Sequence, residues 1–216
     1  MKKIALLHTV KSVYASFQAM LEKEIKDISV TNMVDEFLVT NAREKGYFPP
    51  ENRRKLYLDL LSLAEGQPDV IAVTCSSLTP FAEELRSSFS MPIIVIDERM
   101  CRDAAAIGGN IAVLATAPTT VDPTVSRIKM ESEKLGVAST VRSYLDTKAM
   151  DMLNLGDVQG HDARLAALAR TATADVIVLA QASMATAANL VREATGKKVL
   201  TSPGSCIEDI KAALKG

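Results

Sequence analysis

A long internal repeat is the sequence feature that most restricts how this chain can fold. The stretches 4–9 (IALLHT) and 111–116 (IAVLAT) match at an offset of 107 residues, and 69–77 and 175–183 match at an offset of 106. A third pair of apolar stretches, 92–94 and 198–200, follows in the same order at the same offset of 106. Three ordered matches at nearly one spacing predict two similar halves of roughly 100 residues each.

Each half shows the pattern of alternating strands and helices. Short β-branched and aliphatic runs alternate with longer stretches of helical period, which is typical of βαβ units and a mainly parallel sheet. Strands are expected at 3–7, 28–33, 70–74, 93–96, 111–115, 138–142, 176–180 and 199–201, and helices at 13–26, 52–64, 80–90, 97–107, 123–135, 162–171 and 185–194. The sequence therefore predicts an α/β fold of two similar lobes, 1–97 with 206–216 and 98–205, related by a pseudo-twofold duplication.

Composition narrows the classes of function. The 216 residues carry 25 basic and 26 acidic side chains, scattered along the chain, so nucleic acid is not an expected partner. No apolar run approaches the roughly 20 residues of a membrane span, and the run 4–7 is too short for a signal peptide. Three widely spaced cysteines favour thiols over disulfides. We therefore expect a cytoplasmic protein without a membrane partner, and a homo-oligomer is compatible with the sequence.

The repeat also predicts where the functional site lies. Ligands of parallel α/β sheets bind beyond the carboxyl ends of the strands, so two facing halves would enclose one cleft lined by the loops that follow the strands. These loops carry small hydroxyl residues and helix-start amides, which suit a carboxylate. The candidate residues are His8, Thr9, Ser76, Ser77, Thr116, Thr119, Thr120, Gln181, Ala182 and Ser183.

Cys75 is the candidate acid–base group. It directly follows a predicted strand, and Thr79 and Pro80 favour the start of a helix, as its N-cap and first residue. The amides and dipole of a helix start lower the pKa of a thiol, and the thiolate is the form that acts as a base. The alternative is a buried cysteine that packs as a small apolar side chain, which we expect for Cys101 and Cys206.

Three motifs, 74–77 (TCSS), 115–120 (ATAPTT) and 179–185 (LAQASMA), resemble the aspartate/glutamate/hydantoin racemase superfamily, and the resemblance covers essentially the whole chain. It implies an enzyme that needs neither metal nor pyridoxal phosphate and uses two cysteines, one per half, on opposite faces of an acidic carbon. Cys75 matches the first position, whereas Gln181 stands at the second, and an amide cannot transfer protons as a thiol does. NAD and FAD are not expected, because Gly108-Gly109 lacks the G-x-G-x-x-G pattern.

Three functions are compatible with this departure from the family pattern. The first is a cofactor-independent isomerase, racemase- or epimerase-like, that acts by thiol acid–base chemistry next to a carboxylate of a small amino acid or related acid. The second is a cofactor-free lyase that decarboxylates a malonate-like acid, similar to the single-cysteine arylmalonate decarboxylases of the superfamily. The third is a protein that binds small carboxylates without turnover.

Three basic side chains are candidates for the remaining roles. His161 is the expected replacement acid or base, because an imidazole titrates near neutrality, and the alternative is a solvated helix start. Subtracting 107 maps His161 onto Arg54. The resemblance implies that such paired basic residues hold substrate carboxylates. His8, at the end of the first strand, is expected to point toward the cleft.

Overall fold

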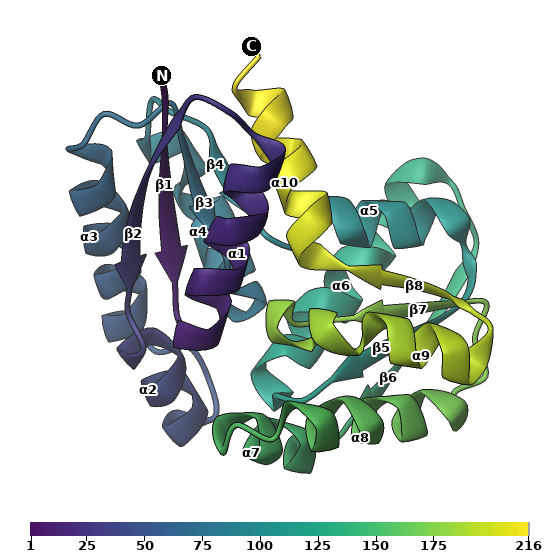
Figure 1. Cartoon of the computed structure of the whole chain (residues 1–216). Helices are drawn as coiled ribbons and strands as arrows, with labels where there is room; N and C mark the ends of the chain where they lie inside the picture. Colours follow the sequence, from purple (N-terminus) through teal and green to yellow (C-terminus); the bar gives the residue numbers. More distant parts are fainter. Residues whose placement is uncertain (216) are drawn as a thin grey trace. The chain divides into compact units, whose positions relative to one another are not determined.

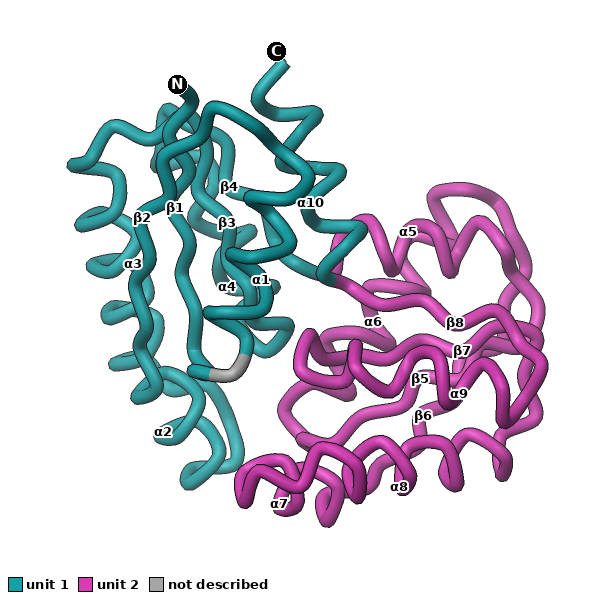
Figure 2. Tube along the Cα trace, in the orientation of Figure 1, with its two compact units in different colours: residues 1–96, 203–216 teal, residues 97–202 magenta. Residues whose placement is uncertain are grey.

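The computed structural model describes residues 1–215, apart from the side chain of Ser12. Two four-stranded sheets, each with flanking helices, form the fold (Figure 1). The chain divides into two compact units: unit 1 is Met1–Ile96 with Pro203–Gly216, and unit 2 is Asp97–Ser202 (Figure 2). Gly216, which ends the predicted first lobe, lies outside the described residues. The predicted α/β class with two similar lobes is confirmed.

Unit 1 is built on a parallel sheet with the strand order β2-β1-β3-β4. The strands are β1 (Lys2–His8), β2 (Ile28–Val34), β3 (Val70–Val73) and β4 (Ile93–Val95). The helices are α1 (Lys11–Glu24), α2 (Phe37–Lys45), α3 (Pro50–Ala64), α4 (Thr79–Leu85) and, from Pro203 on, α10 (Ser202–Ala213), with short 3₁₀ segments η1 (Ser76–Leu78) and η2 (Arg86–Ser88). All four residues of β3 are buried, as expected for a strand that is covered on both faces.

Helical spacing of leucines explains how α3 covers one face of this sheet. Leu56, Leu60 and Leu63 lie on one side of the helix and pack on alternate residues of β1 and β3, among them Leu7 and Ile71. Figure 1 shows α1 and α10 on the opposite face from α3. The sheet is therefore the middle layer of three.

Unit 2 repeats this plan with the strand order β6-β5-β7-β8, again all parallel. The strands are β5 (Gly109–Ala115), β6 (Ser139–Leu145), β7 (Val176–Leu179) and β8 (Lys198–Thr201). The helices are α5 (Glu98–Ile107), α6 (Pro118–Leu135), α7 (Thr147–Asn154), α8 (Val158–Arg170) and α9 (Ala188–Thr195), with the 3₁₀ segment η3 (Ala182–Ala187). One face of the sheet is covered by α7, α8 and α9, and the other by α5 and α6. Within residues 1–215, no helix is long and apolar enough to cross a membrane.

The repeat extends to the hydrogen-bond register of the two sheets. β1 pairs with β3 from Ile4↔Val70 to Leu7↔Val73, and β5 pairs with β7 from Ile111↔Val176 to Leu114↔Leu179. Before β3 and before β7, an aspartate accepts a backbone N–H of the neighbouring strand: Asp69 from Lys3 at 2.7 Å, and Asp175 from Asn110 at 2.8 Å. The predicted duplication is therefore confirmed, and equivalent positions can be identified by register.

Several element boundaries differ from the prediction. α6 begins at Pro118 rather than at 123, so Pro123 lies inside the helix. Because proline has no backbone N–H, the helical hydrogen bond to the carbonyl of Thr119 is not formed. α4 begins at Thr79 with Leu78 at its N-cap position, so the predicted cap at Thr79 is wrong, because η1 occupies the turn before it. Three helices, α2, α7 and α10, are missing from the expected set. α2 buries two of its residues and α7 one, which leaves too little apolar periodicity to recognise these two.

Candidate functional site

The loop after β3 carries the candidate thiol of unit 1. Cys75 has extended backbone (φ −133°, ψ 114°) and precedes η1, and its carbonyl accepts the N–H of Leu78 at 3.0 Å. Cys75 is partly exposed, whereas Cys101 and Cys206 are buried, and no disulfide joins the three. Cys75 is therefore the cysteine that a solute can reach most readily.

His8, the last residue of β1, is buried in unit 1. Its side chain is 0% exposed, and its ring nitrogens lie 2.7 Å from Thr74 Oγ1 (Nδ1) and 3.0 Å from Asn32 Oδ1 (Nε2). Asn32 donates its amide N–H to Gln18 at 2.8 Å, so its oxygen faces His8 and the imidazole proton is assigned to Nε2. Burial lowers the pKa of His8, and the bond to Asn32 opposes this. A neutral His8 therefore links β1 to β2 through Asn32 and also contacts Thr74, the residue directly before Cys75.

Asp35, which follows β2, and Asp59 of α3 form a pair of carboxyl groups in unit 1. Asp35 donates its backbone N–H to the His8 carbonyl at 2.9 Å, and its carboxylate lies 2.5 Å from Lys55 Nζ, which is also 3.3 Å from Asp59. Burial and the neighbouring Asp35 raise the pKa of Asp59 to about 6. Burial alone would raise the pKa of Asp35, but the hydrogen bonds from Lys55 and Asp59 outweigh it and lower that pKa. Asp59 therefore holds a proton in weakly acidic solution, while Asp35 stays ionised.

Unit 2 has the same ion pair without the second carboxyl group. Asp146 follows β6 and donates its N–H to the Ala115 carbonyl at 3.0 Å, as Asp35 does to His8. Arg164 of α8 binds the Asp146 carboxylate with two N–H groups, at 2.8 and 3.0 Å. Lys55 and Arg164 are 109 residues apart (164 minus 55), and this offset places Leu168 at the position of Asp59. The carboxyl group with a raised pKa therefore has no counterpart in unit 2.

Gln181 follows β7 and binds the start of α6 through its side-chain oxygen. Gln181 Oε1 accepts the backbone N–H of Thr116 at 2.7 Å, the hydroxyl of Thr116 at 3.0 Å and the backbone N–H of Ala117 at 3.1 Å. Thr116 is buried. The donors that the sequence predicted for a substrate carboxylate at this point are therefore occupied by a side chain of the protein.

His161 is held by an acidic neighbour within unit 2. Its side chain is 0% exposed, with Nδ1 2.7 Å from Asp162 Oδ1, and the same carboxylate oxygen accepts the hydroxyl of Thr186 at 2.8 Å. The other ring nitrogen, Nε2, is buried and has no hydrogen-bond partner among the described residues. The helix begins at Val158, with Asp157 as N-cap, so His161 lies inside the first turn rather than before it. The N–H on Nδ1 leaves Nε2 as an acceptor.

The burial pattern of α3 and α8 gives a different pairing from the one predicted for His161 and Arg54. Asn52 and Leu56 on α3 are buried, and so are His161 and Leu165 on α8, at an offset of 109 (161 minus 52, and 165 minus 56). His161 therefore corresponds to the buried Asn52. Arg54 is exposed on α3.

The remaining predicted residues lie at the carboxyl edges of their own sheets. Ser76 and Ser77 in η1 and Thr9 after β1 are buried, as is Thr120 in the first turn of α6, while Thr119, Ala182 and Ser183 are partly exposed. The sequence did not point to Asn32, Asp162 or Thr186. A carboxylate directly after His161 was the available signal for Asp162. Within residues 1–215, no group of three or more His, Cys, Asp or Glu side chains is placed to hold a metal ion.

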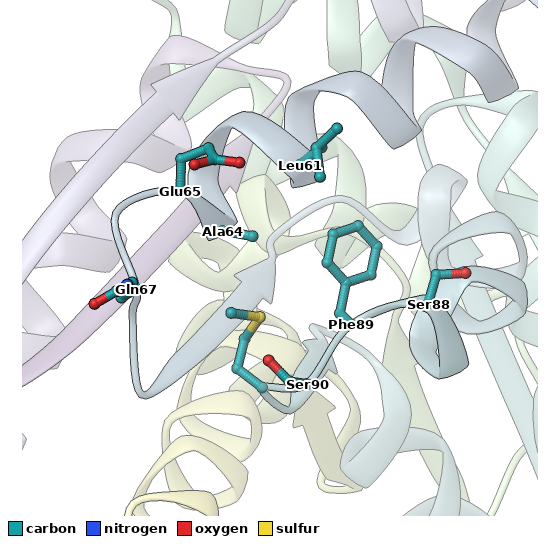
Figure 3. Close-up of a pocket in the computed structure, with 8 residues that line it drawn as sticks. Leu61, Ala64, Glu65, Gln67, Ser88, Phe89 and Ser90 are labelled. Atoms are coloured by element: carbon teal, nitrogen blue, oxygen red, sulfur yellow. The ribbon is translucent and has the colours of Figure 1, made fainter.

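A separate hollow lies at the opposite edge of the unit 1 sheet (Figure 3). Its lining comes from the end of α3 and the segment before β4, and comprises Leu61, Ala64, Glu65, Gln67, Ser88, Phe89, Ser90 and Met91. These segments precede β3 and β4, whereas Cys75 follows β3. The hollow is therefore distinct from the candidate site.

Comparison with known proteins gives one family match and several structural neighbours. The model of the family described as Asp/Glu/Hydantoin racemase matches residues 8–208. Glutamate racemase from Thermus thermophilus, solved in complex with β-chloro-D-alanine, has a TM-score of 0.76 at 14% identity, covering 99% of this chain and 80% of that one. Aspartate racemase from Picrophilus torridus has a TM-score of 0.72 at 13% identity, covering 99% of this chain and 94% of that one.

A third structural neighbour is a racemase whose named substrate is not an amino acid. Allantoin racemase from Pseudomonas fluorescens has a TM-score of 0.64 at 14% identity, covering 100% of this chain and 91% of that one. A search of curated protein sequences found no match. At these identities, the structural likeness concerns the fold.

Proposed function

Because the chain belongs to the Asp/Glu/hydantoin racemase family, we propose that it is a cofactor-independent isomerase acting at the carbon next to a carboxylate of a small amino acid or related acid. Family membership supports an isomerase-type enzyme. The observation that carries the finer proposal is the partly exposed thiol of Cys75 at the carboxyl end of β3, next to the buried hydroxyl residues Ser76 and Ser77. Ligands of parallel sheets bind at this edge.

In the proposed reaction, the Cys75 thiolate removes the proton of the α-carbon. The electron pair of the broken C–H bond moves toward the carboxylate and gives an enediolate, and the proton stays on sulfur. Fixed hydrogen-bond donors then stabilise the added charge on oxygen, and this stabilisation commonly lowers the barrier of such reactions more than any other single effect. Ser76 and Ser77 are the proposed side-chain donors, together with backbone amides of the strand-end loops.

Inversion requires a second group that returns a proton to the opposite face of the carbon. Gln181 stands where the repeat places the equivalent of Cys75, and a carboxamide does not transfer protons at neutral pH. We propose that His161 supplies this proton from Nε2 when the imidazole is in its protonated form and becomes neutral in doing so, with Asp162 as the residue that orients the ring through Nδ1. Proton return by a route other than a second thiol is expected to be slower than removal by Cys75.

Arg54 is the proposed contact for a substrate carboxylate. It lies near the start of α3, and the next residue, Lys55, binds Asp35 directly after β2, so this part of α3 lies at the carboxyl end of β2. Its neighbour Arg53 is already engaged, since it donates to Glu84 at 2.8 Å and lies 4.5 Å from the centre of the Phe81 ring. Arg54 is therefore the better placed of the two for binding a ligand.

A panel of small acids and cyclic ureides in heavy water tests the proposal. We would incubate the protein with glutamate, aspartate, allantoin, hydantoins and malonates and follow the α-hydrogen by NMR. Loss of the α-hydrogen signal from at least one compound, abolished by Cys75→Ala and retained by Cys101→Ala, is the expected result. Release of a fragment without exchange would identify a lyase instead. Equal exchange by the Cys75→Ala protein would overturn the assignment of the thiol.

A further inference from the structure

A chain of hydrogen bonds runs from the surface of unit 1 to the residue before Cys75. Bonds of 2.7 to 3.0 Å join five side chains in this order: Glu22, Gln18, Asn32, His8 and Thr74. Glu22 is exposed, whereas His8 is 0% and Thr74 4% exposed. The chain therefore connects a surface carboxylate with the strand end that carries the thiol.

All the bonds in this chain run in one direction. Because a carboxylate only accepts, Gln18 donates its amide N–H to Glu22 and accepts the amide N–H of Asn32. Asn32 then presents its oxygen to His8, which places the imidazole proton on Nε2 and leaves Nδ1 to accept the hydroxyl of Thr74. Hydrogen bonds in series polarise one another. The chain thus fixes both the tautomer of His8 and the direction of the Thr74 hydroxyl.

The Thr74 hydroxyl has a second neighbour, the carbonyl of Leu7 at 3.1 Å. This carbonyl already accepts the backbone N–H of Thr74 at 2.9 Å, and the hydroxyl has one hydrogen to donate. In neutral His8 the Nδ1 atom carries no proton, so this hydrogen goes to the imidazole. Thr74 is therefore held to β1 twice, by its backbone and by its side chain.

Unit 2 cannot make this side-chain bond. By register, Ala115 stands at the position of His8. Ala180 stands in the same way at the position of Thr74, and the side chains of both alanines lack hydrogen-bonding groups. The backbone bond across the sheet is present in both units, at 2.9 Å in unit 1 and 3.0 Å in unit 2. The unit that carries the thiol therefore adds a bond to a shared backbone frame.

Unit 2 holds its strand end in another way. Gln181, at the position of Cys75, binds the start of α6 with its own side chain. Its Oε1 accepts the backbone N–H groups of Thr116 and Ala117, at 2.7 and 3.1 Å. In unit 1 the corresponding side-chain bond is made one residue earlier, by Thr74. The loop is thus held without using the side chain of residue 75.

We propose that His8 is a positioning residue for Cys75, which acts through the Thr74 hydroxyl to hold the strand end that carries the thiol. A thiolate at such a place is favoured by the backbone N–H groups of the turn that follows it, and this effect depends on where the sulfur lies. His8 therefore promotes thiolate formation without touching the substrate. The effect on turnover rests on the proposed function, whereas the effect on the thiol does not.

Alkylation of Cys75 by iodoacetamide over a range of pH tests this role in the full chain, read by mass spectrometry. The midpoint of the pH profile reports how strongly the surroundings favour the thiolate, and the limiting rate at high pH reports exposure. Thr74→Val removes the hydroxyl and keeps the shape. Its midpoint should rise by about half a pH unit, a factor of about three in thiolate near pH 7. Thr74→Ser, which keeps the hydroxyl, should restore the natural midpoint.

Two substitutions of His8 separate the two ends of its ring. Glutamine places an amide N–H near the position of Nε2 and keeps the bond to Asn32, whereas asparagine places an oxygen near Nδ1 and keeps the bond to Thr74. His8→Gln should therefore raise the midpoint as Thr74→Val does, and His8→Asn should raise it less. The reverse order would contradict a role that acts through Thr74.

A packing variant far from the thiol supplies the matched control. Leu63 is buried at the end of α3, next to the residues that line the hollow at the opposite edge of the sheet. Leu63→Ala should lower the free energy of unfolding through lost packing and leave the midpoint unchanged. An unchanged midpoint in Thr74→Val would overturn the proposal, as would an equal rise in Leu63→Ala. A ring proton on Nδ1 of His8, seen by ¹⁵N NMR near pH 7, would also overturn it.

The positioning role and the isomerase fail in different ways. A raised midpoint in Thr74→Val without α-hydrogen exchange from any compound would retain the positioning role and contradict the isomerase. Exchange by the natural protein with an unchanged midpoint in Thr74→Val would retain the isomerase and contradict the positioning role. Where exchange occurs, Thr74→Val should lower kcat about threefold with little change in KM, because no substrate contact is lost.

Discussion

Replacing Asp59 with asparagine should remove a pH-dependent loss of stability from unit 1. Asp59 lies beside Asp35, and Lys55 bridges the two carboxyl groups. The pKa of Asp59 is raised from its usual 3.8 to about 6, first by burial and then by Asp35. The folded chain therefore keeps this proton to a higher pH than the unfolded chain, and the free energy of unfolding falls as the pH rises from about 4 to 6.

The size of this loss follows from the shift in pKa. One pKa unit corresponds to about 1.4 kcal/mol, so a rise of about two units sets a ceiling of about 3 kcal/mol. The Lys55 side chain is 41% exposed, so solvent screens the charge interactions among Lys55, Asp35 and Asp59. We therefore expect the free energy of unfolding to fall by about half of this ceiling, about 1.5 kcal/mol. The lowered pKa of Asp35 acts below about pH 4, outside this range.

Urea unfolding followed by circular dichroism at a series of pH values measures the effect. Asp59→Asn keeps the neutral shape and a donor toward Asp35, so its free energy of unfolding should not fall between about pH 4 and 6 and should exceed that of the natural protein by about 1.5 kcal/mol at pH 8. Glu65→Gln, which removes an exposed carboxyl group at the end of the same helix, should keep the natural pH dependence. An unchanged slope in Asp59→Asn would refute the reasoning.

Three further predictions concern the site. Cys75 should alkylate faster than Cys101 and Cys206 in the folded protein, as read by mass spectrometry, because the other two are 0% and 1% exposed; the reverse order would exclude Cys75 as the reactive thiol. His161→Gln should lower the inversion rate about a hundredfold with little change in KM, the usual size of a lost acid–base group; an unchanged rate and pH profile would remove His161 from the mechanism. Arg54→Ala should weaken substrate binding by about 1.5 to 3 kcal/mol, whereas Arg53→Ala, whose side chain is held by Glu84, should not; equal effects would return Arg54 to a surface role.

The fold was largely predictable because its strands and its repeat leave strong signals. Continuous apolar runs such as 70–73 mark strands that are buried on both faces, and the matching stretches at offsets of 106 and 107 anticipated the equal register of the two sheets. Cys75 comes directly after such a run, so its location at the carboxyl end of a strand could be predicted. These features are local in sequence or repeated in it.

Features that depend on side-chain reach were not predictable. The bond from Gln181 to Thr116 and Ala117 joins residues 65 and 64 apart, and no local pattern reports it. His8 does end the first strand, as expected, but no local pattern reports that its ring bonds to Thr74 and Asn32. The shift of the repeat offset to 109 in the helix of His161 follows from loops of different length, which a comparison of strands alone does not detect.

The central claim is that a single thiol, Cys75, serves one face of the reacting carbon. The most direct test compares α-hydrogen exchange with inversion for each enantiomer of the best compound in the panel, by deuterium uptake and chiral chromatography. We predict that exchange outpaces inversion from one enantiomer, that the other exchanges slowly, and that Gln181→Cys raises inversion relative to exchange by restoring a thiol at the equivalent strand end. Equal exchange and inversion of both enantiomers by the natural protein would contradict the claim, because it requires an efficient second base.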